Sequence, residues 1–186
     1  MSLQVMSRRA ALAGLVALPA VARAQAVLPE PKTLPPGYIT RAHLAPATGA
    51  APGMKVTVFT PSPGLKVWKI NLTVGDDLMT AMALFMKGHP IKQATLTGIG
   101  GFSTAQLAWY DPKVGAFKLI PADAKCEVSS FVGTISTDAK GEETFHAHVA
   151  LTQTDGSTKS GHLVSATINP VMEIYVTDLG EGRPEQ

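Results

Sequence analysis

The chain contains a single cysteine, Cys126, so it cannot form a disulfide bridge within itself. Cys126 stands among strand-forming residues, and we expect it to be a small buried side chain rather than a reactive thiol. Charged residues are also few, at 16% of the sequence, whereas hydrophobic residues make up 45%. With 186 residues, this composition is sufficient for one domain with a hydrophobic core.

The apolar run over residues 10–22 is too short for an ordinary membrane-spanning helix and is interrupted by Pro19. It follows Arg8-Arg9 and leads into small residues, a pattern typical of an export signal. We therefore expect residues 1–26 to be removed, leaving a periplasmic or secreted protein with no stable membrane span. The paired arginines favour the twin-arginine route, although alanines occupy two positions where that signal prefers an aromatic residue and a lysine.

The expected mature chain lacks an excess of positive charge. The first 26 residues contain three arginines and no acidic residue, so their removal changes the formal net charge from +2 to −1. A slightly acidic domain has no broad positive field to attract nucleic acid. On charge alone, nucleic acid is therefore an unfavourable partner.

Residues 27–53 are rich in proline, which fixes φ and removes backbone donors. We expect this segment to be an extended arm, followed by one domain over residues 54–180 and a tail over 181–186. The arm contains His43, which we expect to be solvated.

The domain is expected to be α+β, with one principal helix on a largely antiparallel sheet. The stretch "GDDLMTAMALFMKGHP" predicts that helix, with Asp76 as its N-cap and Gly88 and Pro90 ending it. Its methionines fit core packing better than a soft copper site. Strand patterns separated by turn residues are predicted over 54–60, 67–74, 93–99, 104–110, 116–120, 127–135, 144–151, 162–168 and 171–177. The glycines of "GIGGF" at 98–102 precede a strand rather than a helix, which favours a bend or tight turn over a phosphate loop.

Three of the five histidines lie in "FHAHVALTQTDGSTKSGHLV", residues 145–164. Side chains alternate between the faces of a strand, so His146 and His148 should share the face opposite the core. A hairpin returning through the turn at 154–161 would bring His162 beside them. Three neutral imidazoles suit a metal site that keeps one open coordination position. The residues alone also allow a solvated or structural histidine face, or acid–base chemistry without a metal.

A series of motifs in order carries a resemblance to a known family. These are "VGDDL", "GIGGFSTAQLAWYD", "CEVSSFVGTIS", "FHAHVALTQTDGSTKSGHL" and "VMEIYVTDL", spread over residues 66–178. The chain resembles the plants and prokaryotes conserved (PPC) domain family, found in plant AT-hook proteins and in standalone bacterial proteins. One departure is Ser160-Gly161, where the family usually has two glycines.

The resemblance implies an antiparallel sheet, assembly as a homotrimer and a metal site at His146, His148 and His162. Zinc is the default ion for an all-imidazole site, and copper or nickel would also fit. Glu173 matches the family's glutamate and is a candidate to accept a hydrogen bond from a histidine N–H, although a solvated or structurally paired glutamate is the favoured interpretation.

The leading prediction is an exported, trimeric protein that binds a divalent metal as a binding or sensing module. One alternative is a metal-dependent enzyme acting on a small molecule, with Glu173 and Glu127 as candidate acids or bases. The other is DNA binding by family analogy. Here the AT-hook core is absent, because "EGRP" at 181–184 has Glu181 in place of its first arginine.

Overall fold

The structure is a computed structural model that describes residues 31–41, 44, 47–122 and 124–181. Residues 1–26, where the export signal is expected, lie outside the described residues, as do His43 and residues 182–186 of the tail. The described elements are β1 (Tyr38–Ile39), β2 (Lys55–Ser62), β3 (Leu65–Thr73), α1 (Leu78–Gly88), β4 (Gln93–Asp111), β5 (Ala116–Pro121), β6 (Cys126–Thr137), β7 (Glu143–Thr152) and β8 (Thr158–Asp178).

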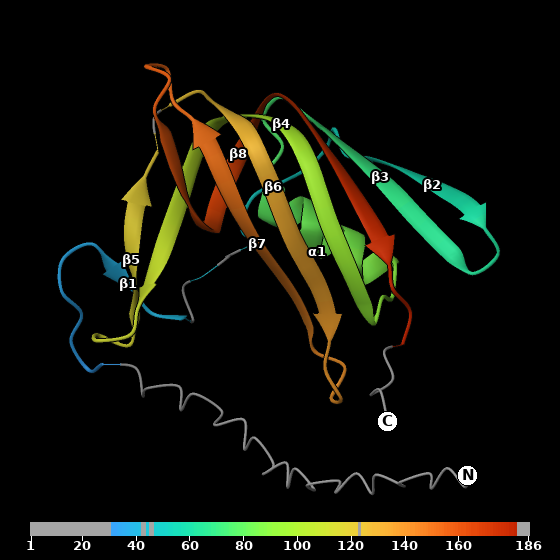
Figure 1. The fold of residues 1–186 in the computed structure, drawn as a ribbon, viewed down its shortest axis with the longest axis horizontal. Helices are drawn as coiled ribbons and strands as arrows, with labels where there is room; N and C mark the ends of the chain where they lie inside the picture. The colour runs from blue at the N-terminus through green and yellow to red at the C-terminus, as the bar shows by residue number, and fades with distance from the viewer. Residues whose placement is uncertain (1–30, 42–43, 45–46, 123, 182–186) are drawn as a thin grey trace, which may run out of the picture.

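The strands form one antiparallel sheet in the order β1-β5-β4-β6-β7-β8-β3-β2, which arches over the helix in Figure 1. An additional pairing joins β4 to β8, so that β4, β6, β7 and β8 make a closed ring of paired strands. The expected antiparallel sheet with one principal helix is confirmed. The fold is mainly β rather than the expected α+β, because the described chain is mainly strand and its helix has only 11 residues.

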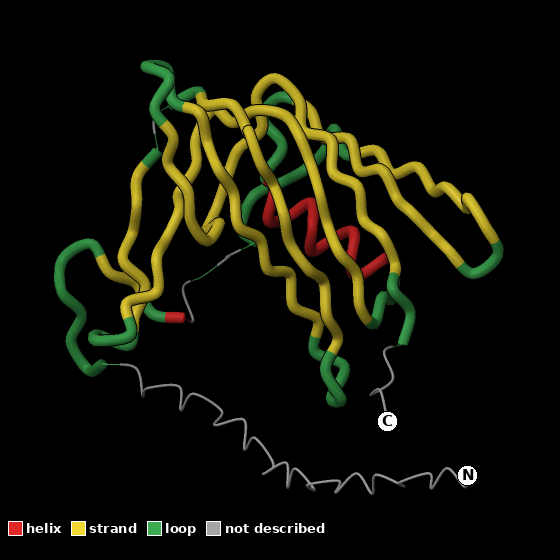
Figure 2. The backbone as a smooth tube through the Cα atoms, in the orientation of Figure 1, coloured by secondary structure: helices red, strands yellow, loops and turns green. Residues whose placement is uncertain are grey.

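Helix α1 lies against the concave side of the sheet, as Figure 2 shows. Its N-cap is Asp77, whose side chain accepts a hydrogen bond from the Thr80 backbone N–H at 2.7 Å. The expectation that Asp76 is the N-cap is therefore wrong by one residue. Asp76 is instead buried and accepts hydrogen bonds from the backbone N–H groups of Thr73 and Gly53. Asp77 thus caps the helix, whereas Asp76 links the turn at Thr73 to Gly53 of the arm.

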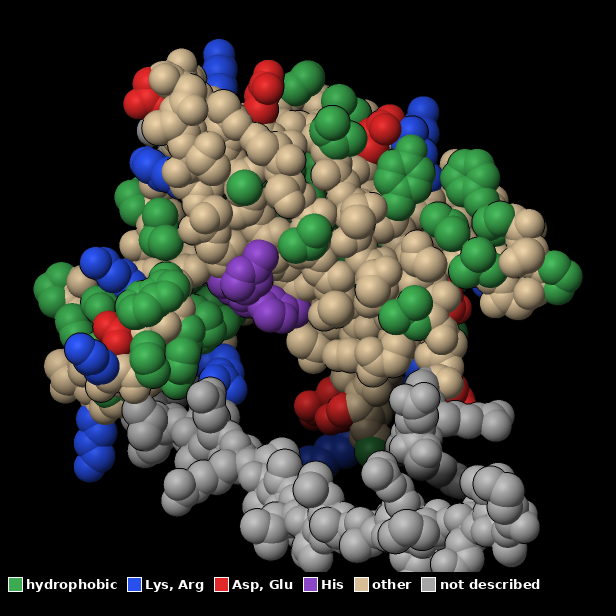
Figure 3. Space-filling model, in the orientation of Figure 1, with side chains coloured by type: hydrophobic (Ala, Val, Ile, Leu, Met, Phe, Trp, Pro, Cys, Tyr) green, Lys and Arg blue, Asp and Glu red, His purple; other side chains and the backbone are tan. Residues whose placement is uncertain are grey.

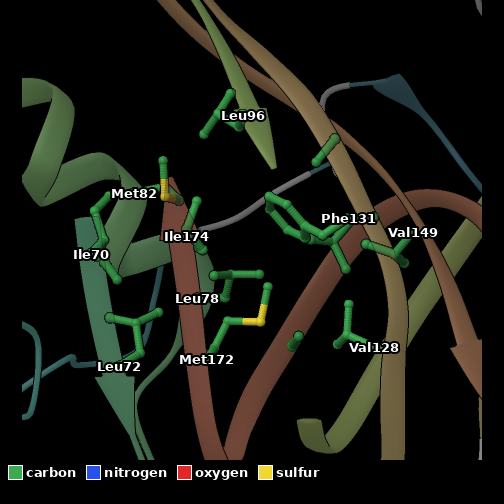
Figure 4. Packing of buried hydrophobic residues seen from close by; sticks show 14 of the residues in the cluster. Ile70, Leu72, Leu78, Met82, Leu96, Val128, Phe131, Val149, Met172 and Ile174 are labelled. Atoms are coloured by element: carbon green, nitrogen blue, oxygen red, sulfur yellow. The ribbon is translucent and has the colours of Figure 1, made fainter. Parts of the chain in front are cut away.

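The core fills the space between α1 and the inner face of the sheet. Figure 4 shows Met82 and Leu78 of the helix beside side chains of β3, β6 and β8. Cys126 is 5% exposed within this cluster, which confirms that it is a small buried side chain. Among the described residues, no helix is long and apolar enough to cross a membrane.

The arm lies along the domain over most of its described residues. Tyr38 and Ile39 pair with β5, and the backbone N–H of Asp77 donates to the carbonyl of Ala50 at 2.7 Å. Tyr38 also donates a hydrogen bond to Asp111. The proline-rich segment therefore contacts the domain at Tyr38 and Ile39 and again at Ala50.

The glycines of "GIGGF" lie inside one long strand. The expected strands over 93–99 and 104–110 are both parts of β4, and those over 162–168 and 171–177 are both parts of β8. Of the bend or tight turn expected at these glycines, the bend is present, with register shifts against β6 and β8 at Gly100. A side chain on Gly100 would place its Cβ 2.7 Å from Met172 Cα and closer still to the Val171 carbonyl oxygen. Glycine is therefore required here because two long bent strands approach each other closely.

The close approach of β4 and β8 predicts that Gly100→Ala lowers the free energy of unfolding by about 1–3 kcal/mol or more, because backbone atoms must move to admit the methyl group. Urea denaturation would measure this. Gly88→Ala is the matched control, since a Cβ at Gly88 meets no atom within 4 Å. Equal stability of the two variants would contradict this explanation of the motif.

Candidate metal centre

Strand β7 alternates between the core and the outer face of the sheet. Ala147, Val149 and Leu151 are buried, whereas His146 and His148 are exposed. The shared face of the two histidines is therefore confirmed, and it follows from the two-residue period of a strand with one buried face.

His162 lies directly opposite His148 in the register of β7 and β8. The expected turn is shorter than predicted, because β8 already begins at Thr158. The imidazole centroids are 5.1 Å apart for His146 and His148, 4.8 Å for His146 and His162, and 5.6 Å for His148 and His162. One nitrogen from each ring lies within 4.8 Å of the others. The three side chains thus converge on one point.

The chain has Ser160 and Gly161 where the family that it resembles usually has two glycines, and the structure shows why only position 161 requires glycine. A Cβ at Gly161 would lie 2.7 Å from the backbone carbonyl oxygen of Ala108 in β4. Ser160 is exposed and occupies the preceding position in β8. A side chain is therefore tolerated at 160, while the close packing of β8 on β4 beside His162 requires glycine at 161.

The surroundings of His146 and His162 favour their neutral forms. Burial, followed by the proximity of His146 and His148, lowers the pKa of His162 to about 4. Burial, followed by the proximity of His148, lowers the pKa of His146. The Phe117 ring adds to the burial of His162, with its centroid 5.4 Å away. Since only a neutral imidazole can donate a lone pair to a metal, these shifts keep the ligand atoms available below neutral pH.

The donor set suits a divalent metal with a preference for nitrogen. Tetrahedral zinc with Zn–N bonds of about 2.0–2.1 Å requires nitrogens about 3.4 Å apart. The nitrogens here lie within 4.8 Å, a spacing that small rotations of exposed side chains can close. Three protein ligands would leave one position for water or another ligand, as in zinc sites that bind exogenous groups.

The two candidate glutamates lie elsewhere on the sheet. The Glu173 carboxylate is 2.7 Å from Lys69 Nζ, an ion pair between β8 and β3. Glu127 pairs with Thr152 at the far end of β7 from His146 and lines a separate cavity with Lys125. Neither belongs to the group of potential ligands found among the described residues.

A cavity of about 1160 Å³ adjoins the three histidines. Figure 3 shows the histidine cluster at the edge of a hollow in this face. The only other charged side chains among its described lining residues are Arg41 and Glu143. No local pattern in the sequence reveals this cavity, because it is lined by residues of the arm, α1, β4, β5, β6, β7 and β8 together.

Several solved structures share this fold. A proposed DNA-binding protein from Bacteroides thetaiotaomicron is 23% identical, covering 69% of this chain and 86% of its own, with a TM-score of 0.62. A plant- and prokaryote-conserved protein from Pyrococcus horikoshii is 25% identical, covering 71% and 90%, with a TM-score of 0.58. A metal-containing protein from Archaeoglobus fulgidus is 24% identical, covering 72% and 89%, with a TM-score of 0.57.

No curated protein matches the chain. The name of the Bacteroides protein does not support the expectation that nucleic acid is an unfavourable partner, which stays a prediction. The model of the Plants and Prokaryotes Conserved domain matches residues 60–180, most of the segment expected to form the domain. The chain therefore belongs to the PPC domain family.

Proposed function

We propose that this PPC-domain protein binds a divalent metal, with zinc the first choice, through His146, His148 and His162, and that it acts as a binding or sensing module. The observation that carries the proposal is the convergence of one nitrogen from each ring to within 4.8 Å. The metal-containing relative from Archaeoglobus fulgidus, which has the same fold, is consistent with it.

Metal binding accounts for the cluster better than a solvated histidine face does. Burial and the neighbouring imidazoles lower the pKa of His146 and His162, so in the absence of a ligand the proximity of the rings only makes protonation of these two less favourable. A cation shared by all three converts that arrangement into a favourable one.

The proposal includes export and assembly as a homotrimer. Export is supported by the composition of residues 1–26, and assembly by the family resemblance. The outer sheet face that bears the histidines also exposes Ile99, Val132 and Tyr175, at 64%, 51% and 37% of their surface. Exposed apolar side chains on one face are typical of a surface that contacts another protein subunit.

A metal-dependent enzyme is the second candidate, and the cavity beside the histidines favours it. An ion with an open position could activate water there. The proposal of a binding module stands first because neither Glu127 nor Glu173 lies with the histidines to act as acid or base.

The geometry predicts that a His146→Ala/His148→Ala double variant loses zinc, because one remaining imidazole cannot hold the ion. Metal analysis of purified protein after dialysis would show about one zinc per chain in the parent and a background level in the variant. Thr97→Ala/Thr134→Ala, on the same outer face, should keep full zinc content. Equal zinc in all three proteins would end the proposal.

The lowered pKa values predict that zinc affinity depends less on pH than it would with three ordinary imidazoles. Three imidazoles of ordinary pKa, about 6.5, would lose roughly a thousandfold in affinity between pH 7.5 and 5.5, or tenfold each. His162, with its pKa lowered to about 4, remains neutral over this range and contributes no loss. Competition with a chromophoric chelator should therefore show a loss of at most about a hundredfold. A thousandfold loss would mean that His162 is not held as described.

The packing beside His162 predicts that Gly161→Ala weakens zinc binding about tenfold or more, because relief of the clash with Ala108 moves β8. Circular dichroism would verify that the variant is folded. Ser160→Ala, the adjacent change without a clash, should bind zinc as the parent does. Unchanged affinity in a folded Gly161→Ala protein would show that the position of His162 does not depend on this contact.

A further inference from the structure

The cavity beside the histidines arises where two paired strands separate. β7 and β8 pair from Thr152 and Thr158 as far as His148 and His162. Beyond this point β8 continues against β4, beginning with Ala108, while β7 continues against β6 alone. The three histidines therefore lie at the narrow end of a wedge between the two strands.

The walls of this wedge are largely apolar. Helix α1 supplies the half-buried Ala83 and Met86, and β4, β5 and β7 supply Trp109, Tyr110, Phe117 and Phe145. Trp109 is 54% exposed despite its size. A volume of about 1160 Å³ is far more than a metal-bound water needs and is slightly above the roughly 300–1,000 Å³ typical of pockets for drug-sized ligands.

The charge around the cavity indicates which head group would fit. Among its described lining residues besides the histidines, only Arg41 and Glu143 are charged, and their charges are opposite. The charge of a bound divalent ion would therefore dominate the narrow end, and it favours an anionic oxygen donor. Met86, on the opposite wall, can adapt to a hydrocarbon of irregular shape.

We propose that this cavity binds a small apolar carboxylate, with the carboxylate at the three-histidine end and the hydrocarbon against Ala83 and Met86 of α1. The inference rests on the proposed metal site for its head group, and on the wedge between β7 and β8 for its hydrocarbon part. The ligand of the binding module would therefore be an amphipathic acid rather than a bare inorganic anion.

Calorimetric titration with decanoate tests the inference, using zinc-loaded and zinc-free full-length protein. Decanoate should bind the zinc-loaded protein at least tenfold more tightly than the zinc-free protein. Acetate, which has only the head group, and decanol, which has only the chain, should each bind at least tenfold more weakly than decanoate. Equal affinity of decanoate for both forms, or of acetate and decanoate for the loaded form, would overturn it.

Two substitutions on α1 locate the hydrocarbon. Ala83 lines the cavity, so Ala83→Phe should reduce decanoate affinity at least tenfold while zinc content stays unchanged. Leu84 is 48% exposed and is not among the lining residues, so Leu84→Phe should alter neither. Unchanged decanoate binding in a folded, zinc-loaded Ala83→Phe protein would overturn the inference and leave the zinc site standing. Absence of zinc from the parent protein, measured separately, would overturn both.

Discussion

The register of β7 against β8 is the constraint on which the site depends. His148 is opposite His162 because β8 begins at Thr158 and pairs back along β7 to that point. A slip of one residue would turn His162 toward the core and bury a different set of side chains. The buried Ala147, Val149 and Leu151 oppose such a slip. Burial on one face of the sheet therefore fixes the histidines on the other.

The same pairing explains why a site and a cavity occur together. β8 pairs with β7 and then, through its bent course, with β4 and β3. The bend requires the close approach at Gly100, and the packing on β4 requires Gly161. Where β8 leaves β7, a cavity opens beside the three imidazoles, and Ala83 and Met86 of α1 line it. The glycines thus shape the site although they carry no chemistry of their own.

Local patterns predicted much of the fold and the histidine cluster, because both depend on short periods in the sequence. Alternation placed His146 and His148 on one face, and capping and breaking residues located α1 to within a residue or two. Such local patterns could not predict which distant strands pair with each other, or in which register. Nothing local distinguishes a turn at Gly100 from a bend inside a strand, since the difference lies in the backbone of Val171 and Met172. Glu173 likewise matched a family position, but its contact with Lys69 depends on how β3 and β8 align.

Anomalous diffraction at the zinc absorption edge, from crystals of the protein grown with zinc, would show whether the three histidines hold one ion. We expect one strong peak within about 2.1 Å of a ring nitrogen of each of His146, His148 and His162. A peak bound by fewer than these three side chains, or no peak at this hairpin, would contradict it.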